Sequence, residues 1–432
     1  MKKRKYTISV SPDDDDDHGI RSIVPTEYII YFSGFLDLFG VSMILPLILP
    51  QARDLGASAT LAGILGSVYG SMQLFSGPII GNWSDSIDRR MSLTLVLFLS
   101  AVGYGLLGIA TSIAMMFLAR LPLGIFKHSQ GISKSYLADF IPAHDRNTVL
   151  GHFNAASSIG FILGPMVGGH IAELPGGFNM VGLLSAFIFI LNSVLIWLTL
   201  PSVKSLSHPD LAREDSVTSL KKLNSDEINF SPRLFLDSLK QIDWKDLWDW
   251  FLIKFLMGFS VILFRSNFSL MTREKYGVGA MMNGYLMSFS GATASLSGFF
   301  VGRISNRYRN DYKLIKHMSL LMTFTLLGLI TSPNIWILVM FLPILSLATS
   351  VLRVSTTSLT IERSKNQGIG ATIGLHQSIM SVARMLSSVI AGVSLEFSNS
   401  GPGILALFSS CVALILLIFR PQDAASKRKK NN

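Results

Sequence analysis

The sequence predicts an all-α membrane protein in which twelve transmembrane helices form two six-helix, pseudo-symmetric halves. The first observation is composition, since 49% of the 432 residues are hydrophobic and only 15% are charged, against about 25% charged in soluble proteins. The second is a recurrence of apolar segments long enough to cross about 30 Å of hydrocarbon. The third is an internal repeat. Backbone groups in lipid need partners within their own segment, so these segments are predicted to be helices.

The predicted spans divide into two groups of six, separated by a polar and charged stretch. They cover residues 27–49, 58–80, 91–111, 113–138, 149–171 and 179–200, then 249–271, 280–302, 314–331, 334–358, 369–395 and 402–419. The predicted organisation is a disordered tail (1–26), an N-terminal half (27–200), a central loop (201–248), a C-terminal half (249–419) and a basic tail (420–432).

The internal repeat relates the two halves. Asp139 and Gly169 precede Glu362 and Gly392 by the same 223 positions. Two six-helix halves related by an axis normal to the membrane are typical of transporters, with a central site near the bilayer midplane.

The basic residues follow a topological pattern rather than a nucleic-acid-binding one. Although the net charge is +10, the loops on one side of the predicted membrane hold most Lys and Arg, and the other side holds only Arg53, Arg273 and Lys275. By the positive-inside rule, both termini are expected in the cytoplasm. Cys411 is the only cysteine, so no intramolecular disulfide is possible.

Three cations occur at intervals of seven residues in the fourth predicted span. Arg120, Lys127 and Lys134 would share one helical face, which drifts by only about 20° per step. A charge at the bilayer centre costs at least about 2.5–3.5 kcal/mol, so such residues face a bundle interior or a wet cavity. The sequence therefore predicts a polar route that attracts an anion.

Asp37 is the one carboxylate placed well inside a predicted span. Burial raises a carboxylate pKa and a nearby cation lowers it, so Asp37 would exchange a proton as its distance from Arg120 changes. The alternative is a permanent Asp37–Arg120 ion pair that holds the bundle together.

Further cationic candidates lie in other predicted spans. The predicted substrate-binding set is Arg120, Lys127, His128, Arg265, Arg353 and Arg384. His128 is a second candidate proton carrier, because the unperturbed pKa of histidine is nearest to neutral.

The loop after the second span combines small, acidic and basic residues. The predicted cytoplasmic gate consists of Gly81, Asp85, Arg89, Arg90 and Asp139. A glycine lets helices approach closely, and the carboxylates can pair with the arginines. The alternative is a basic loop that only sets topology.

The fifth span carries a run of small residues with a proline. The run consists of Gly160, Gly164, Pro165, Gly168 and Gly169. Proline removes a backbone donor and kinks a helix, while the glycines permit close packing. A plain packing motif is the alternative.

These motifs resemble the major facilitator superfamily, specifically its tetracycline-resistance-like drug:proton antiporter branch. Gly81–Arg90 is similar to the superfamily's 2–3 loop signature, although Asp88 and Ser86 depart from it. Gly160–Gly169 is similar to the antiporter motif, and Arg120 followed by Gly124 to the fourth-helix motif linked to proton transfer. The resemblance implies that helices 1, 4, 7 and 10 line a cavity.

The sequence therefore predicts a monomeric secondary active transporter of a small, anionic organic solute, with a proton as the coupling ion. Two alternatives remain, namely proton-coupled efflux of amphiphilic or cationic drugs, and a membrane receptor or scaffold that kept the fold without transport. No nucleophile–base pair, phosphate loop or metal-ligand spacing is visible, so neither an enzyme nor a cofactor nor a metal is predicted.

Overall fold

A computed structural model describes residues 26–141, 145–201, 244–308, 310–363 and 369–419, and every regular element in these ranges is a helix. The N-terminal half contains α1 (Thr26–Ile44), η1 (Leu45–Leu47), α2 (Ile48–Asp54), α3 (Ala59–Ser86), α4 (Arg89–Gly108), α5 (Ile113–Phe126), α6 (Ser129–Phe140), α7 (Arg146–Ala172) and α8 (Gly177–Thr199). The C-terminal half contains α11 (Trp244–Ser266), α12 (Phe268–Tyr276), α13 (Ala280–Arg307), α14 (Asp311–Thr331), α15 (Ile335–Arg363), α16 (Ile369–Phe397) and α17 (Gly401–Phe419).

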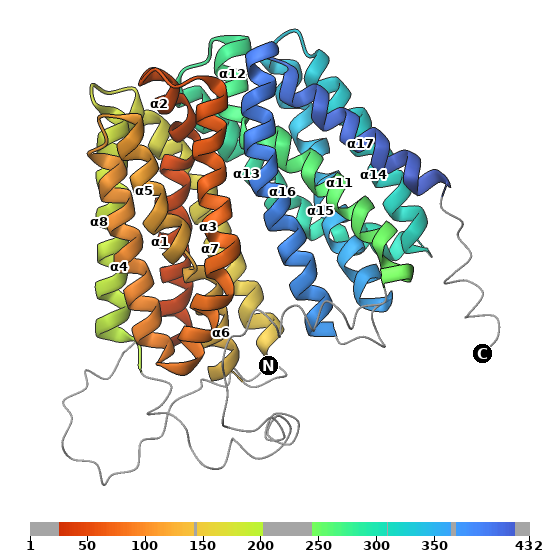
Figure 1. Cartoon of the computed structure of the whole chain (residues 1–432). Coiled ribbons are helices and arrows are strands. Elements are labelled where there is room, and N and C mark those ends of the chain that lie inside the picture. Colours follow the sequence, from red (N-terminus) through yellow and green to blue (C-terminus); the bar gives the residue numbers. More distant parts are fainter. Residues whose placement is uncertain (1–25, 142–144, 202–243, 309, 364–368, 420–432) are drawn as a thin grey trace.

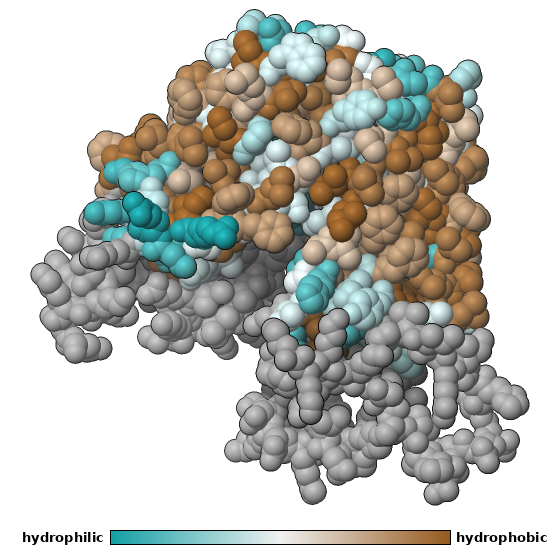
Figure 2. All heavy atoms as spheres, turned by 180° about the vertical axis from the view of Figure 1, so that it is seen from behind, coloured by the Kyte–Doolittle hydropathy of each residue, from teal (hydrophilic) through white to brown (hydrophobic). Residues whose placement is uncertain are grey.

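Each predicted span coincides with one helix or with a helix that is broken along its length. Eight helical segments among the described residues are long and apolar enough to cross a membrane, and the bent pair α11–α12 would make nine. The segments that fall short are α3 and α13, which are rich in glycine and serine, and the broken pair α5–α6. Hydrophobic side chains cover much of the lateral surface in Figure 2. The chain is therefore a multi-pass integral membrane protein.

The two groups of helices form two bundles, each with its own apolar core. One core is built from residues between Ile29 and Leu200, and another from residues between Trp250 and Leu417. Figure 1 shows the bundles side by side. The predicted tails, 1–26 and 420–432, lie outside the described residues except for Thr26, and so does most of the predicted central loop, 201–248. Helix α11 begins at Trp244, within the predicted loop.

The bundles touch at one end and part at the other. Figure 1 shows them meeting near α2 and α12 and diverging at the end where α1 begins and α17 ends. We call the first end the closed face and the second the tail face.

Glycines at seven-residue intervals trace this separation along α3. A Cβ at Gly63 would lie 2.9 Å from the Cα of Gly392, and one at Gly70 would lie 3.6 Å from Met385, both on α16. Seven residues further along α3, a Cβ at Gly77 would meet, among the described residues, only His128 of its own half. Figure 1 shows the α3 and α16 ribbons diverging toward the tail face.

The repeat-related helix α13 behaves in the same way. Gly284 packs against Pro165 of α7, and a Cβ at Gly291 would lie 3.5 Å from Ile162. Among the described residues, a Cβ at Gly298, seven residues on, would meet nothing within 4 Å. The described parts of α13 and α7 thus separate toward the tail face.

Candidate functional site

The helix that carries the three predicted cations is broken at the middle one. Helix α5 ends at Phe126, α6 begins at Ser129, and Lys127 between them adopts ψ 63°. The prediction that Arg120, Lys127 and Lys134 share one face is therefore wrong. Arg120 and Lys127 are buried, whereas Lys134, which follows the break, is exposed.

Side chains of α3 bind the backbone groups that the break leaves without helical partners. Gln73 donates to the carbonyl oxygen of Lys127 at 3.2 Å, and Ser76 donates to that of Gly124 at 3.1 Å. Ser76 Oγ also lies 2.9 Å from His128 Nε2. A break at membrane depth is tolerated only where such groups are satisfied again. The His128 side chain thus takes part in the hydrogen bonds that stabilise the break.

The break places Lys127 against Asp37 of α1. Lys127 Nζ lies 2.5 Å from Asp37 Oδ1, and Ser129 donates to the same oxygen at 2.7 Å. Gln130 Nε2 donates to Asp37 Oδ2 at 2.8 Å. We call Asp37, Lys127, Ser129 and Gln130 the central polar cluster. The ion-pair partner of Asp37 is therefore Lys127, and not Arg120 as the sequence suggested.

The central polar cluster is almost entirely enclosed. The exposed fraction is 2% for Asp37 and 8% for Lys127. The Lys127 ammonium also lies 4.9 Å from the ring centroid of Phe189 on α8, which stacks on Tyr104 of α4. Breaking such a pair by removing one partner costs about 3–5 kcal/mol, because a buried charge is left uncompensated. Asp37 and Lys127 therefore compensate each other's buried charge.

Arg120 lies on α5 with its guanidinium over an aromatic ring of α3. Its Cζ is 5.4 Å from the ring centroid of Tyr69, and its buried Nε has no hydrogen-bond partner. Tyr69 is bonded to Gln73 at 2.8 Å. Among the described residues no carboxylate forms an ion pair with Arg120. Arg120 is therefore a buried cation with unused hydrogen-bonding capacity.

Arg384 of α16 comes from the other half and lies close to the same part of α3. A Cβ at Gly70, next to Tyr69, would lie 3.9 Å from the carbonyl carbon of Arg384. The Arg384 guanidinium donates to Ser381 of its own helix at 2.7 Å. Cations from both halves therefore reach the α3–α16 contact.

Arg265 and Arg353 form the remaining cationic group. They lie on α11 and α15, both are exposed, and their charges are close enough to interact. No carboxylate in the described residues pairs with either of them. Two like charges held near one another favour an anionic third party.

The predicted gate lies at the tail face of the N-terminal half. Arg89 Nε lies 3.0 Å from Asp139 Oδ2, and its Nη1 donates to Ser84 at 2.6 Å. Arg90 donates to the carbonyl oxygen of Trp197 and lies over its ring. Gly81 has no neighbour within 4 Å of an added Cβ, and the Asp85 side chain is outside the described structure. The contacts named here lie within one half.

The small-residue run on α7 packs in two directions. Gly160, Gly164 and Gly168 lie directly against the α1 backbone at Phe35, Phe39 and Met43. Gly169 faces Ala280 of the other half instead. Through this run, α7 packs against α1, which carries Asp37, and also contacts α13 of the other half.

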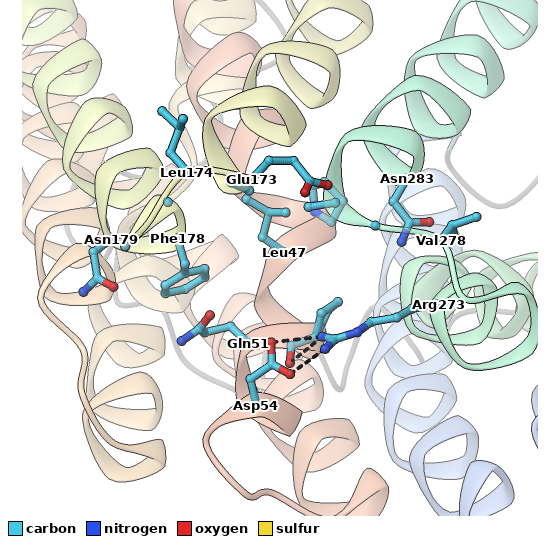
Figure 3. A pocket seen from close by; sticks show the side chains of 17 residues that line it. Leu47, Gln51, Asp54, Glu173, Leu174, Phe178, Asn179, Arg273, Val278 and Asn283 are labelled. Carbon is cyan, nitrogen blue, oxygen red and sulfur yellow. Dashed lines mark hydrogen bonds and ion pairs between the residues drawn. The ribbon is translucent and has the colours of Figure 1, made fainter.

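A cavity of about 460 Å³ lies at the closed face and contains none of the predicted site residues (Figure 3). Its lining includes Gln51, Glu173 and Arg273. Neither Asp37 nor Lys127 lines this cavity, so it is not the predicted substrate site. In the part of the chain that is described, no group of three or more His, Cys, Asp or Glu could hold a metal ion.

Sequence reasoning missed Tyr69, Gln73, Ser129 and Gln130, all of which contact the predicted residues. The available signal was polar side chains within or beside apolar spans. It was weak, because serine and glutamine are common there and only the break brings them together.

Two helical bundles in a membrane, with polar side chains buried at a broken helix, are typical of membrane transporters. A family model described as Major Facilitator Superfamily matches residues 30–387. The chain belongs to the Major Facilitator Superfamily, whose members transport solutes and are not enzymes.

Relatives cover nearly the whole chain. Solute carrier family 22 member 18 of Rattus norvegicus is 26% identical over 399 residues, which is 90% of this chain and 92% of the relative. Quinolone resistance protein NorA of Staphylococcus aureus is 21% identical over 409 residues, 94% and 98% of the two chains. The crystal structure of the human organic anion transporter MFSD10 (TETRAN) superposes with a TM-score of 0.61 at 20% identity, covering 91% and 98%.

Proposed function

We propose that this transporter moves a small organic anion by alternating access, coupled to a proton on Asp37. The observation that carries the proposal is the central polar cluster, in which a buried carboxylate and a buried ammonium are each other's only described counter-ions. Arg120, Arg265, Arg353 and Arg384, without a described ion-pair partner, add positive charge from both halves. His128 is a less favourable proton carrier, since it is engaged with Ser76 at the break.

Competition for Lys127 provides the coupling. While Asp37 is ionised, its carboxylate is paired with the Lys127 ammonium, and an incoming carboxylate would have to displace Asp37 from that pair. A proton on Asp37 removes that charge, so Lys127 becomes available to the anion. Anion and proton therefore favour each other's binding, as linkage requires.

The basic loops support a tail face that lies in the cytoplasm. The structure then corresponds to the cytoplasm-open conformation, and the tail-face residues Gly81, Asp85, Arg89, Arg90 and Asp139 form the gate that rearranges when that side closes. The two halves of a single chain provide cations on both sides of the site, so the proposed working unit is a monomer.

Efflux of cationic or amphiphilic drugs is the second candidate, and the similarity to the quinolone resistance protein favours it. It requires a carboxylate to attract the cation. In the described residues Asp37 is 2% exposed and already paired with Lys127. The surplus of positive charge opposes a cationic substrate through Coulomb repulsion.

Counterflow in proteoliposomes tests the proposal. Purified protein is reconstituted and loaded with a panel of carboxylates, sulfonates, neutral metabolites and lipophilic cations. We expect uptake of at least one anion, accelerated by an inward proton gradient and lost in Arg120→Gln. Arg307→Gln, an exposed arginine at the end of α13, is the matched control and retains uptake.

The other outcomes separate the alternatives. Uptake of lipophilic cations without any anion would establish drug efflux and refute the anion proposal. No flux of any compound, with folded protein in the vesicles, would favour the receptor or scaffold.

A further inference from the structure

The closed face is crossed by two ion pairs that are built from the same dipeptide pattern in each half. Arg53 Nε lies 3.5 Å from Glu274 Oε1, and Arg273 Nη2 lies 2.6 Å from Asp54 Oδ1. Each pair joins the two halves. Figure 3 shows Arg273 directed toward Asp54.

The members of these pairs are repeat-related positions. Arg273 and Glu274 follow Arg53 and Asp54 by 220 positions. Each arginine therefore pairs with the carboxylate of the equivalent dipeptide in the other half. A twofold axis between the halves produces this reciprocal pattern, in which one contact generates the other.

Two glutamates repeat the pattern a short distance away. Glu396, in the last turn of α16, accepts from the Thr60 backbone N–H at 3.0 Å. Glu173, just after α7, accepts from the Met281 backbone N–H, also at 3.0 Å. Thr60 and Met281 are each the second residue of their helices, α3 and α13. Each glutamate thus binds an unpaired N–H at the positive end of a helix in the opposite half.

These glutamates also obey the repeat. Glu396 follows Glu173 by 223 positions, the same spacing that relates Gly169 to Gly392. Those two glycines pack against Ala280 and Ala59, the first residues of the two capped helices. By contrast, the cross-half hydrogen bond from Tyr285 to His170 has no counterpart, because the equivalent positions are Ile64 and Val393.

We propose that these four contacts form a twofold clasp that holds the closed face shut, and that releasing it is what opens the transporter to that side. The inference rests on alternating access in the proposed function, but not on the identity of the substrate. Glu173 and Glu396 are its positioning residues. Glu173 holds the end of α7 against the start of α13, and Glu396 holds the end of α16 against the start of α3.

The side chains of the two ion pairs in the clasp are partly exposed to solvent, which makes the pairs weak enough to separate. The side chains of Arg53, Glu274, Arg273 and Asp54 are 37%, 22%, 42% and 50% exposed. Exposed ion pairs of this kind each change an equilibrium by less than about fivefold. Several weak contacts that act together can hold one conformation, yet they present no single large barrier to release.

Cysteine accessibility beneath the clasp tests the inference without a substrate. Ala59 is 3% exposed and packs with Leu270 and Leu395. In a Cys411→Ser background, Ala59→Cys reports opening of the closed face through its rate of reaction with a maleimide. We expect Glu173→Gln and Glu396→Gln each to accelerate labelling about threefold, and the double variant about tenfold. Glu27→Gln, at the opposite end of the bundle, is the matched control and leaves the rate unchanged.

A charge exchange provides the second arm. Arg273→Asp alone places a third acid beside Asp54 and Glu274, so labelling should accelerate. Adding Asp54→Arg restores the pair in reverse and should return the rate to that of the reporter background.

Two results would overturn the clasp. One is a labelling rate in the double glutamine variant equal to that of Glu27→Gln. The other is acceleration by Arg273→Asp that Asp54→Arg does not reverse. Because labelling needs no ligand, either result leaves the anion proposal standing, and a failure of anion flux leaves the clasp standing.

Discussion

At the scale of single residues, the site depends on one buried ion pair whose members come from distant parts of the chain. Asp37 accepts hydrogen bonds from Lys127, Ser129 and Gln130. A carboxylate with three donors is well compensated as an anion. Removing either charge therefore has consequences for both stability and binding.

Lys127→Met should lower stability by about 3–5 kcal/mol, because Asp37 is left as a buried charge without a counter-ion. The double variant Asp37→Asn/Lys127→Met should lose less than the sum of the two single variants. Thermal unfolding of the detergent-solubilised protein measures the effect. Lys134→Met, an exposed lysine of α6, should unfold close to the wild type. Additive losses in the double variant would contradict direct pairing.

The pH dependence of anion binding should identify the proton carrier. A proton on Asp37 releases Lys127, so the affinity for the anion should increase as the pH falls. Asp37→Asn mimics the protonated carboxyl and should bind the anion with an affinity that no longer depends on pH. Calorimetric titration at acidic and alkaline pH measures this. His128→Gln should retain the dependence, and loss of the dependence there would transfer the role to His128.

At the scale of elements, two local departures from a regular helix position the site. The α5–α6 break turns Lys127 toward α1, and hydrogen bonds from α3 support it. The glycine run of α7 lets that helix lie against the α1 backbone. Together they fix the distance between the chain segments that carry Asp37 and Lys127.

Ser76→Ala should weaken the break, since the Gly124 carbonyl loses its donor and His128 loses a partner. A lost buried hydrogen bond costs about 1–3 kcal/mol, so the unfolding midpoint should fall. Ser71→Ala is a matched control on α3, because the hydrogen bond that Ser71 donates in the described structure goes to Ser67 of its own helix. Equal midpoints for the two variants would show that α3 does not support the break.

Gly164→Ala should be strongly destabilising, because the added methyl would collide with Ser42 and would lie 2.6 Å from the Phe39 carbonyl oxygen. Gly151→Ala on the same helix meets nothing within 4 Å. That control should gain up to about 1 kcal/mol from the higher helix propensity of alanine. Opposite shifts in unfolding midpoint are expected, and a neutral Gly164→Ala would contradict the close packing.

At the scale of the whole molecule, the glycines of α3 and α13 differ in their surroundings between the closed face and the tail face. Near the closed face, Gly63 and Gly284 pack closely against backbone atoms of the other half. Toward the tail face, an added Cβ at Gly77 or Gly298 would have no neighbour within 4 Å in the described part of the other half. Closing the tail face requires α13 to approach α7 along the part where they are now separated.

Gly298→Phe should therefore slow transport without destabilising the protein. The ring would extend from a position that has no described neighbour within 4 Å of an added Cβ, and it would obstruct closure of the tail face. Anion counterflow should fall several-fold, while the unfolding midpoint stays close to that of the wild type. Leu296→Phe, at an exposed position of the same helix, is the control and should transport normally. Full activity of Gly298→Phe would show that this face does not close as inferred.

Hydropathy was enough to predict the helices, because hydropathy over about 20 residues is a local property and lipid leaves the backbone few alternatives. The sequence also indicated the pairing of the halves through the repeated glycines, and the family through its motifs. It singled out Asp37 and Lys127 as charges in apolar surroundings. Each of these inferences needs only neighbouring residues or a fixed spacing.

The pairing of the buried charges could be seen only once the helices were packed together. Arg120 and Lys127 are equally plausible partners for Asp37 on a continuous helix. The break between α5 and α6 brings Lys127 to Asp37 and leaves Arg120 over Tyr69. That break depends on donors from α3, and the clasp depends on how two halves of similar sequence dock. Both are long-range contacts, and no local pattern in the chain specifies them.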